Sequence, residues 1–277
     1  MADPATSENL TMWWSWGRNP NVFWGGVLVV VGILFLLSNL NLNFNWDVIW
    51  PVLLIAFGLW LVVSRVGRGG AVGSFDASEA RDGLDRGKLE LSVGAGRVEV
   101  RSAALGDQLY RIHVDHGGSQ PNVRLDRATG TVSVATRFDW FLGPPRLTID
   151  AQLSDAVPWE VSCNSRSIHG EFDLSTTPIS GFACRTGASE LTLSLPAPKG
   201  DVPIRVQGGA MTVHIDRPAG AAIKVHASAG AIHMRADGSG KDGIGDRDWR
   251  STGFDSAADR YDVSISGGAV NVDVKER

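Results

Sequence analysis

Two apolar runs near the start of the chain stand out against a polar remainder. Residues 23–40 (FWGGVLVVVGILFLLSNL) and 48–63 (VIWPVLLIAFGLWLVV) contain no charged side chain. As helices they reach about 24–27 Å, close to the ~30 Å hydrocarbon core of a bilayer. The polar connection at 38–47 is short, so the two helices must be antiparallel neighbours. The pattern predicts a transmembrane helical hairpin at 22–64 after an N-terminal tail at 1–21; the alternatives are a signal peptide and buried helices of a soluble protein.

Tryptophan and glycine are distributed as a membrane hairpin requires. Tryptophan is enriched at membrane–water interfaces, and seven of the ten tryptophans fall within the first 60 residues. The predicted interface residues are Trp13, Trp14, Trp16, Trp24, Trp46, Trp50 and Trp60. Small residues let helix backbones approach closely in a bilayer, and the predicted helix-packing residues are Gly25, Gly26, Gly32 and Gly58.

The basic residues around the hairpin predict its orientation. Arg18 precedes it, Arg65 and Arg68 follow it, and the connecting loop has no Lys or Arg. Cytoplasmic segments carry the excess of Lys and Arg. We therefore expect a two-pass protein with both termini in the cytoplasm.

After the hairpin, the composition and the hydrophobic pattern divide the chain into two further segments. Residues 65–88 are rich in Gly, Ser and charges without a period, which predicts a flexible linker. From residue 89 onward apolar and polar positions alternate with period two, as in SELTLSLP (189–196) and MTVHIDRP (211–218). This alternation is typical of strands with one buried face. We expect an all-β domain at 89–277.

A small-residue triplet interrupts the alternation at regular intervals. The triplets around 187, 208 and 229 are 21 residues apart, and other units are spaced by 22 or 23 residues. A period of this length is typical of stacked repeats, in which a crowded corner leaves no room for large side chains. The predicted fold is a β-solenoid, and an antiparallel β-sandwich is the alternative. The predicted rung corners are Gly94, Gly96, Gly187, Gly208, Gly209, Gly230, Gly267 and Gly268.

One polar segment, 235–261, interrupts the repeat before the last unit. Trp249 and Phe254 are its only large aromatic anchors besides Tyr261. We expect an insertion that forms a surface loop or part of a cap. The final unit ends in charged residues, which suits a terminal strand that must not aggregate.

Composition and motifs argue against most catalytic chemistry. The net charge of −4 and the absence of a basic stripe speak against nucleic-acid binding. The glycine-rich segments lack the spacing of nucleotide-binding loops, and no nucleophile motif occurs. His214 and His233 occupy similar outward positions and suggest metal binding weakly, since solvated histidines are commoner. Cys163 and Cys184 are too few for a disulfide framework, although one bridge is compatible with their spacing. We predict no enzymatic activity, cofactor or metal.

Two stretches resemble known bacterial families. The hairpin, with its "LL-x-N-L" exit and "W-P-x-L-L-I-x-x-G-L" return, resembles the LiaI/LiaF-type transmembrane region. The segments WEVSCNSRSIHGEFDLS (159–175) and TGASELTLSLP (186–196) resemble the toast-rack and cell-wall-active-antibiotic-response domains that follow such hairpins. The resemblance implies a regulator or scaffold in the bacterial cytoplasmic membrane that works with histidine kinases in envelope stress responses. Neither motif is catalytic.

The sequence and this resemblance leave three classes of function open. In the first, the protein contacts a membrane partner such as a histidine kinase, through helix packing and through the rigid β-domain. In the second, the β-domain is a module that binds an envelope glycan or lipid head group. In the third, it is a structural solenoid that self-associates by stacking its ends.

Overall fold

The computed structural model describes residues 54–55, 72–117, 120–136 and 147–277. The chain divides into two units, Met1–Gly67 and Arg68–Arg277. In the first unit the described residues are Leu54 and Ile55, which are helical and exposed. The predicted hairpin, with its seven interface tryptophans and four packing glycines, lies outside the described residues. Within the described ranges, no helix is both long and apolar enough to cross a membrane.

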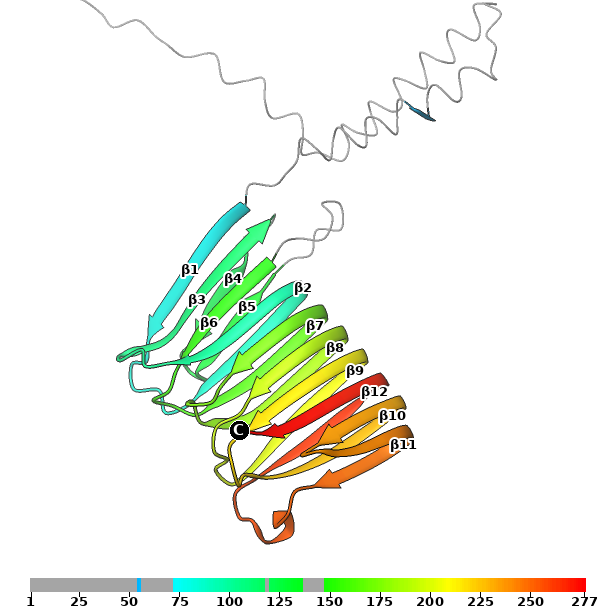
Figure 1. Cartoon of the computed structure of the whole chain (residues 1–277). Helices are drawn as coiled ribbons and strands as arrows, with labels where there is room; N and C mark the ends of the chain where they lie inside the picture. The colour runs from blue at the N-terminus through cyan, green and yellow to red at the C-terminus, as the bar shows by residue number, and fades with distance from the viewer. Residues whose placement is uncertain (1–53, 56–71, 118–119, 137–146) are drawn as a thin grey trace, which may run out of the picture. The chain divides into compact units, whose positions relative to one another are not determined.

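The second unit is built almost entirely from one large sheet of twelve strands (Figure 1). The elements are β1 (Val72–Ala80), β2 (Gly87–Ala103), β3 (Gln108–Gly117), β4 (Asn122–Asp126), β5 (Thr131–Ala135), β6 (Leu147–Ser154), β7 (Trp159–Asp173), β8 (Ile179–Ser194), β9 (Asp201–Arg217), β10 (Ala222–Ala236), β11 (Ser239–Arg250), the 3-10 helix η2 (Phe254–Ser256) and β12 (Arg260–Glu276). The order across the sheet is β1-β3-β6-β2-β7-β8-β9-β12-β10-β11, and the short strands β4 and β5 pair with each other and, through β5, with β2.

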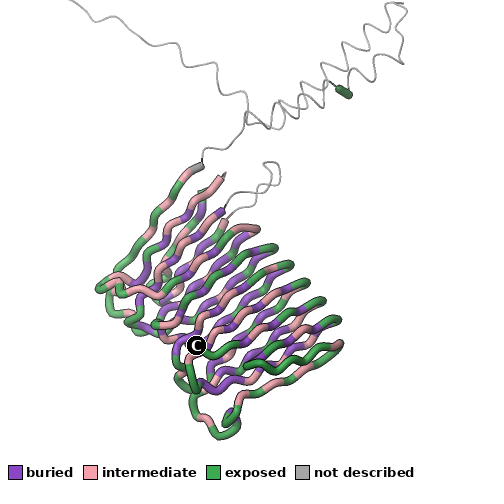
Figure 2. The backbone as a smooth tube through the Cα atoms, in the orientation of Figure 1, coloured by how far each residue is buried: buried purple, intermediate pink, exposed green. Residues whose placement is uncertain are grey.

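Each long strand bends at its small triplet and so supplies two arms of a rung. In β9 we call 201–207 the first arm and 211–217 the second arm, and the other rungs are named by register with β9. Because the inward position moves from Val206 to Met211, an odd number of residues, the alternation changes phase at the bend and both arms bury side chains in the same interior. The buried apolar residues of β9 are Val202, Ile204, Val206, Met211, Val213 and Ile215. Figure 2 shows this alternation of buried and exposed residues along successive rungs.

Equivalent positions of neighbouring rungs pair directly. Cys163 of β7 is opposite Cys184 of β8, and Cys184 is opposite Val206 of β9. The six long strands β2, β7, β8, β9, β12 and β10 are parallel to their neighbours in this way. The prediction of stacked β rungs is confirmed. The sheet is folded along the corners and is not closed on the opposite side, where loops connect successive rungs.

The rungs do not stack in the order of the sequence, which corrects the simple repeat expected for 89–277. Strand β2 lies beside β7, although β3 to β6 intervene in the chain. Strand β12 lies between β9 and β10, so the last unit of the sequence is inserted into the stack. The periodic pattern could not show this, because every rung offers its neighbours the same alternation.

A buried arginine connects the ends of three strands, β9, β10 and β12, at the place where β12 is inserted. The Arg217 side chain is 4% exposed, and its Nη2 lies 2.5 Å from Asp237 Oδ2 and 3.3 Å from Glu276 Oε2. Its Nη1 donates a hydrogen bond of 2.8 Å to the carbonyl oxygen of Ala221. These contacts join the end of β9, the turn after β10 and the end of β12.

Rungs near both ends of the stack run in the opposite direction. Strands β3 and β4 are antiparallel to β6 and β5, which are themselves parallel to β2, so β3 and β4 run against the direction of the interior rungs. At the other end, the polar segment 235–261 contributes β11, which pairs antiparallel with β10 and covers its edge. Phe254 of this segment is buried, and Trp249 packs partly against the core.

The predicted linker at 65–88 is too long. Strand β1 forms within it and pairs antiparallel with β3 over its whole length. Ala77 is half-buried against the core, while Ser74, Asp76 and Ser78 are exposed. A strand at the edge of a sheet keeps one row of backbone groups and much of its surface in solvent, so its composition resembles that of a linker.

Candidate interaction surface

The corners of the rungs are stacked with the backbones in close contact. A Cβ atom on Gly187 would lie 2.6 Å from the Arg166 carbonyl oxygen, and one on Gly208 would lie 2.5 Å from that of Thr186. The same crowding recurs at three further corner glycines, Gly209, Gly267 and Gly268, whose Cβ atoms would lie 2.7–2.9 Å from a neighbouring carbonyl oxygen. Gly230 has the corresponding contact at 3.0 Å, Gly96 faces Leu147, and Gly94 lies at the bend of β2. These distances explain why the corner excludes side chains.

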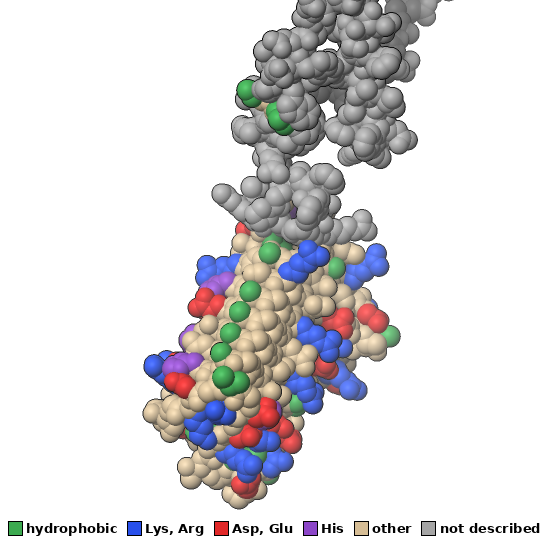
Figure 3. Space-filling model, turned by 90° about the vertical axis from the view of Figure 1, so that its right-hand side faces the viewer, with side chains coloured by type: hydrophobic (Ala, Val, Ile, Leu, Met, Phe, Trp, Pro, Cys, Tyr) green, Lys and Arg blue, Asp and Glu red, His purple; other side chains and the backbone are tan. Residues whose placement is uncertain are grey.

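A row of alanines runs along the corners beside these glycines. Ala188, Ala210, Ala269 and Ala231 are direct register partners on β8, β9, β12 and β10. Figure 3 shows a row of apolar side chains along one ridge of the domain, and the histidines visible in this view lie on one side of it. All four alanines are exposed, so the row presents their methyl groups to solvent.

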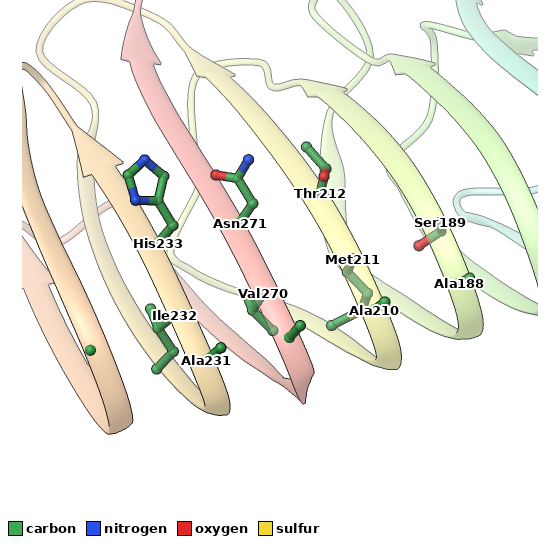
Figure 4. Close-up of a pocket in the computed structure, with 12 residues that line it drawn as sticks. Ala188, Ser189, Ala210, Met211, Thr212, Ala231, Ile232, His233, Val270 and Asn271 are labelled. Atoms are coloured by element: carbon green, nitrogen blue, oxygen red, sulfur yellow. The ribbon is translucent and has the colours of Figure 1, made fainter.

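The alanines line one side of a shallow groove of about 600 Å³. Met211, Val270 and Ile232 also line the groove, but each is only 4% exposed and belongs to the core beneath it. The rim is polar and consists of Ser189, Thr212, Asn271 and His233. Figure 4 shows Thr212, Asn271 and His233 projecting from neighbouring strands on the second-arm side of the bends. We call these residues together the corner groove.

The histidines of the domain take part in ion pairs between strands. Five of the six lie within 4 Å of a carboxylate: His113 with Asp76 (2.7 Å), His169 with Glu190 (3.2 Å), His214 with Asp273 (3.7 Å), His226 with Asp248 (2.9 Å) and His233 with Asp242 (2.6 Å). The hydrogen bond to Asp76 raises the pKa of His113 above its usual value.

Metal binding by His214 and His233 was suggested by their outward positions on consecutive units. The structure separates them, because β12 lies between β9 and β10 and places Asn271 and Asp273 between the two rungs. Across the described ranges, no group of three or more His, Cys, Asp or Glu side chains is arranged to hold a metal ion.

The two cysteines are neighbours and both are reduced. Cys163 and Cys184 are register partners, buried on the inner side of the first arms. The hydrogen bond between the thiols and their burial raise the pKa of Cys184 well above its usual value. A thiol held in its protonated form is a weak nucleophile, so this pair has a packing role.

A second, smaller hollow lies on the outer surface of the first arms. It has a volume of about 220 Å³ and is lined by Arg185, Arg205, Asn164, Gln207 and Ser162 around Ala183. Sequence analysis missed both this hollow and the corner groove. Aligning the triplets would have placed Ala188, Ala210 and Ala231 at equivalent positions, but the hollow depends on which rungs are neighbours.

Comparison with known proteins identifies the two parts of the chain. Residues 22–62 match the family described as the LiaI-LiaF-like transmembrane region. Residues 70–216 match the N-terminal domain of toast_rack, DUF2154, and this match covers more than half of the chain. The chain belongs to the toast_rack family. The resemblance noted from the sequence is confirmed, and the two families together fit a membrane-associated module of the envelope stress response.

Solved structures share the fold of the toast_rack domain. A "putative cell adhesion protein" from Clostridium sporogenes aligns with a TM-score of 0.63 at 16% identity, over 74% of this chain and 100% of that one. A "putative adhesin" from Bacteroides fragilis aligns at 6% identity over 73% and 97% of the two chains, but its TM-score of 0.22 carries no argument. No curated protein matches the sequence. The first likeness, at this identity, concerns the fold alone.

Proposed function

We propose that this toast_rack protein is a membrane-anchored, non-enzymatic regulator or scaffold of the bacterial envelope stress response. In this proposal it acts by direct contact with a membrane protein such as a histidine kinase. The observation that carries the proposal is the match of a LiaI-LiaF-like transmembrane region at 22–62 directly before a toast_rack domain that starts at residue 70. A partner in the same membrane is held at high local concentration by such an anchor.

The corner groove is the surface that we assign to this contact. Its exposed alanines offer apolar contact area, and the buried Met211, Val270 and Ile232 support them from beneath. The rim residues Thr212, Asn271 and His233 supply hydrogen-bonding groups around this apolar centre. An apolar centre with a polar rim is the usual arrangement of a protein–protein interface.

The stacked backbone also makes the groove rigid, which favours a regulatory contact. The strands on both sides of each corner are paired with those of the neighbouring rungs, and the corner glycines bring the backbones into close contact. Neighbouring corners could move apart only if this strand pairing were broken. A rigid surface loses little conformational entropy on binding. The proposal therefore expects the partner, and not the toast_rack domain, to change shape.

Cross-linking from single positions tests the proposal. A photoreactive amino acid replaces Ala210 in the groove, and a matched chain carries it at Arg124, which is exposed on β4. After irradiation of native membranes, we expect the Ala210 chain to cross-link a membrane protein that mass spectrometry identifies as a sensor kinase, and the Arg124 chain not to do so. Cross-linking of no membrane protein from Ala210, or equal cross-linking from both positions, would count against the proposal.

The cytoplasmic position of the toast_rack domain is a separate part of the proposal. It rests on Arg18, Arg65 and Arg68 flanking the hairpin. External protease added to protoplasts that carry a tag after Arg277 should leave the tag intact. Loss of the tag would move the domain outside the cell and favour the alternative function, an envelope ligand-binding module.

A further inference from the structure

We propose that the hollow on the first-arm face is a binding site for a phosphate group, independent of the partner contact proposed above. Its lining combines two guanidinium groups, two amides and a hydroxyl group, and includes no carboxylate. All five of these groups donate hydrogen bonds. Their convergence on one hollow of about 220 Å³ defines the site.

The register of three adjacent rungs brings the donors together. Asn164 of β7, Arg185 of β8 and Gln207 of β9 form one row across the strands. Ser162, Ala183 and Arg205 form the next row on the same face, so the two arginines are diagonal neighbours. Side chains two residues apart on a strand point to the same side of the sheet, so both rows line one surface.

Small side chains create the hollow between the two long arginines. Ser162 of β7 and Ala183 of β8 occupy the same row as Arg205 of β9. Their side chains end at Oγ and Cβ, so they leave a depression on the surface of the sheet beside Arg205. The floor between the rows is formed by Cys163 and Cys184, whose side chains are buried on the other side. The arginines therefore stand at the edge of a depression instead of on a flat surface.

The charge of the two arginines is not neutralised by the protein. Within the described ranges, neither Arg185 nor Arg205 has a hydrogen bond or an ion pair. The nearest carboxylates on this face are already paired: Glu90 and Glu160 with Lys88, at 2.9 and 4.0 Å, and Asp262 with Lys224, at 3.9 Å. These carboxylates do not line the hollow, so an anion there would meet the two guanidinium groups first.

The number of donors favours phosphate over carboxylate. A carboxylate presents two oxygens, whereas a phosphate presents three or four and can accept from both guanidinium groups and from the amides together. Planar guanidinium groups match phosphate oxygens in pairs, and charge-assisted hydrogen bonds of this kind are the strong ones. The ligand could be free phosphate, which presents four terminal oxygens, or the phosphodiester of a lipid head group, which presents two non-bridging oxygens and two weaker ester oxygens.

Equilibrium dialysis of the full chain in a non-ionic detergent tests the site. One arm uses labelled inorganic phosphate, and the other uses glycerophosphoglycerol, a soluble phosphodiester head group. We expect saturable binding of at least one probe, weakened about tenfold or more when both arginines are replaced in the double variant Arg185→Gln, Arg205→Gln. Tighter binding of inorganic phosphate would indicate free phosphate as the ligand, and tighter binding of the diester would indicate a lipid head group.

Two further variants distinguish a site from general charge attraction. Arg124→Gln removes one positive charge, half of the change in the double variant, at an exposed arginine on β4 that has no partner within the described ranges, and it should leave binding unchanged. Asn164→Asp retains both arginines but places a carboxylate beside Arg185, and it should abolish binding. The proposal is overturned if neither probe binds saturably, or if Arg124→Gln weakens binding as much as the double variant does.

Discussion

The interior rungs and the rungs near the two ends of the stack follow different rules. From β2 through β7, β8, β9 and β12 to β10, parallel strands repeat the same bend and the same inward positions. Towards the ends, β3 with β4 and then β11 run in the opposite direction, and the two described non-glycine residues with positive φ, Asp82 and Asp237, lie in turns there. The interior is therefore specified by stacking, and the ends are specified by local turn chemistry. Four substitutions test this distinction, from the largest expected effect to the smallest.

Trp159 connects the interior to the N-terminal end and should have the largest effect. It is completely buried at the start of β7, its ring lies against Gly87, and its Nε1 donates a hydrogen bond of 2.9 Å to the carbonyl oxygen of Ser154, the last residue of β6. Trp159→Ala should lower the free energy of unfolding by about 4 kcal/mol, because it removes a large buried ring and leaves a cavity. Chemical denaturation followed by circular dichroism measures the change.

Trp249 provides the control for this substitution. It lies on β11 and is only partly buried. Trp249→Ala should have a smaller effect that hydrogen exchange locates in β10 and β11. Equal losses of stability from the two substitutions would contradict the view that Trp159 joins two parts of the stack.

Gly208 tests the stacking of the interior corners. In Gly208→Ala the new Cβ would lie 2.5 Å from a backbone carbonyl oxygen and 2.8 Å from the Met211 sulfur. Since both neighbouring rungs hold that backbone, we expect a loss of about 3 kcal/mol in the free energy of unfolding. Gly240→Ala on β11 is the matched control, because its Cβ meets nothing within 4 Å and the stability should hardly change. If Gly208→Ala is as well tolerated, close stacking does not determine the corner composition.

The sequence predicted the interior far better than the ends. Each interior rung repeats its triplet and its alternation, so Gly187 and Gly208 could be aligned without knowledge of the fold. The order of rungs could not be predicted, because a pattern shared by all rungs does not select a neighbour. The reversal into β11 had a local signal that was missed: Asp237-Gly238 joins Ala236 to its partner Ser239, and both turn residues have positive φ. Asp-Gly is a strong hairpin signal.

The candidate surfaces depend on that missing order. The corner groove needs Ala269 of β12 between Ala210 and Ala231, and the sequence places it after all the others. The phosphate site needs the diagonal relation of Arg185 to Arg205, which follows from the register of β8 on β9. Side chains from separate rungs acquire a common function only through pairing, so single-sequence patterns could not identify them.

Arg217 tests whether side-chain chemistry holds β12 in its inserted position. Arg217→Met retains much of the buried side-chain volume but leaves Asp237, Glu276 and the Ala221 carbonyl oxygen without their partner. Asp237 and Glu276 are partly exposed and can be solvated, so we expect a loss of about 2 kcal/mol. Arg250→Met removes an exposed pair with Asp255 and should cost less than about 0.5 kcal/mol. Similar values for the two variants would show that the buried cluster does not stabilise the insertion.

His113 gives the smallest effect, confined to the N-terminal end. Its Nδ1 lies 2.7 Å from Asp76 of β1, and this contact raises the pKa of His113 above its ordinary 6.5. A group with a raised pKa stabilises the fold below its unfolded pKa, and this contribution is lost as the pH rises through the folded value. Asp115, 3.3 Å from Nε2, acts in the same direction.

Amide exchange of β1, expressed as protection factors, should therefore show stronger protection on the acid side of the His113 pKa than on the alkaline side. Both partners are substantially exposed, so the difference should be small and screened by salt. His113→Gln should remove this pH dependence, whereas His226→Gln, which breaks the pair with Asp248 at the opposite end, should leave β1 unchanged. Protection of β1 that rises with pH in the unaltered chain would contradict the assignment, because the imidazolium–carboxylate contact can only weaken as His113 loses its proton.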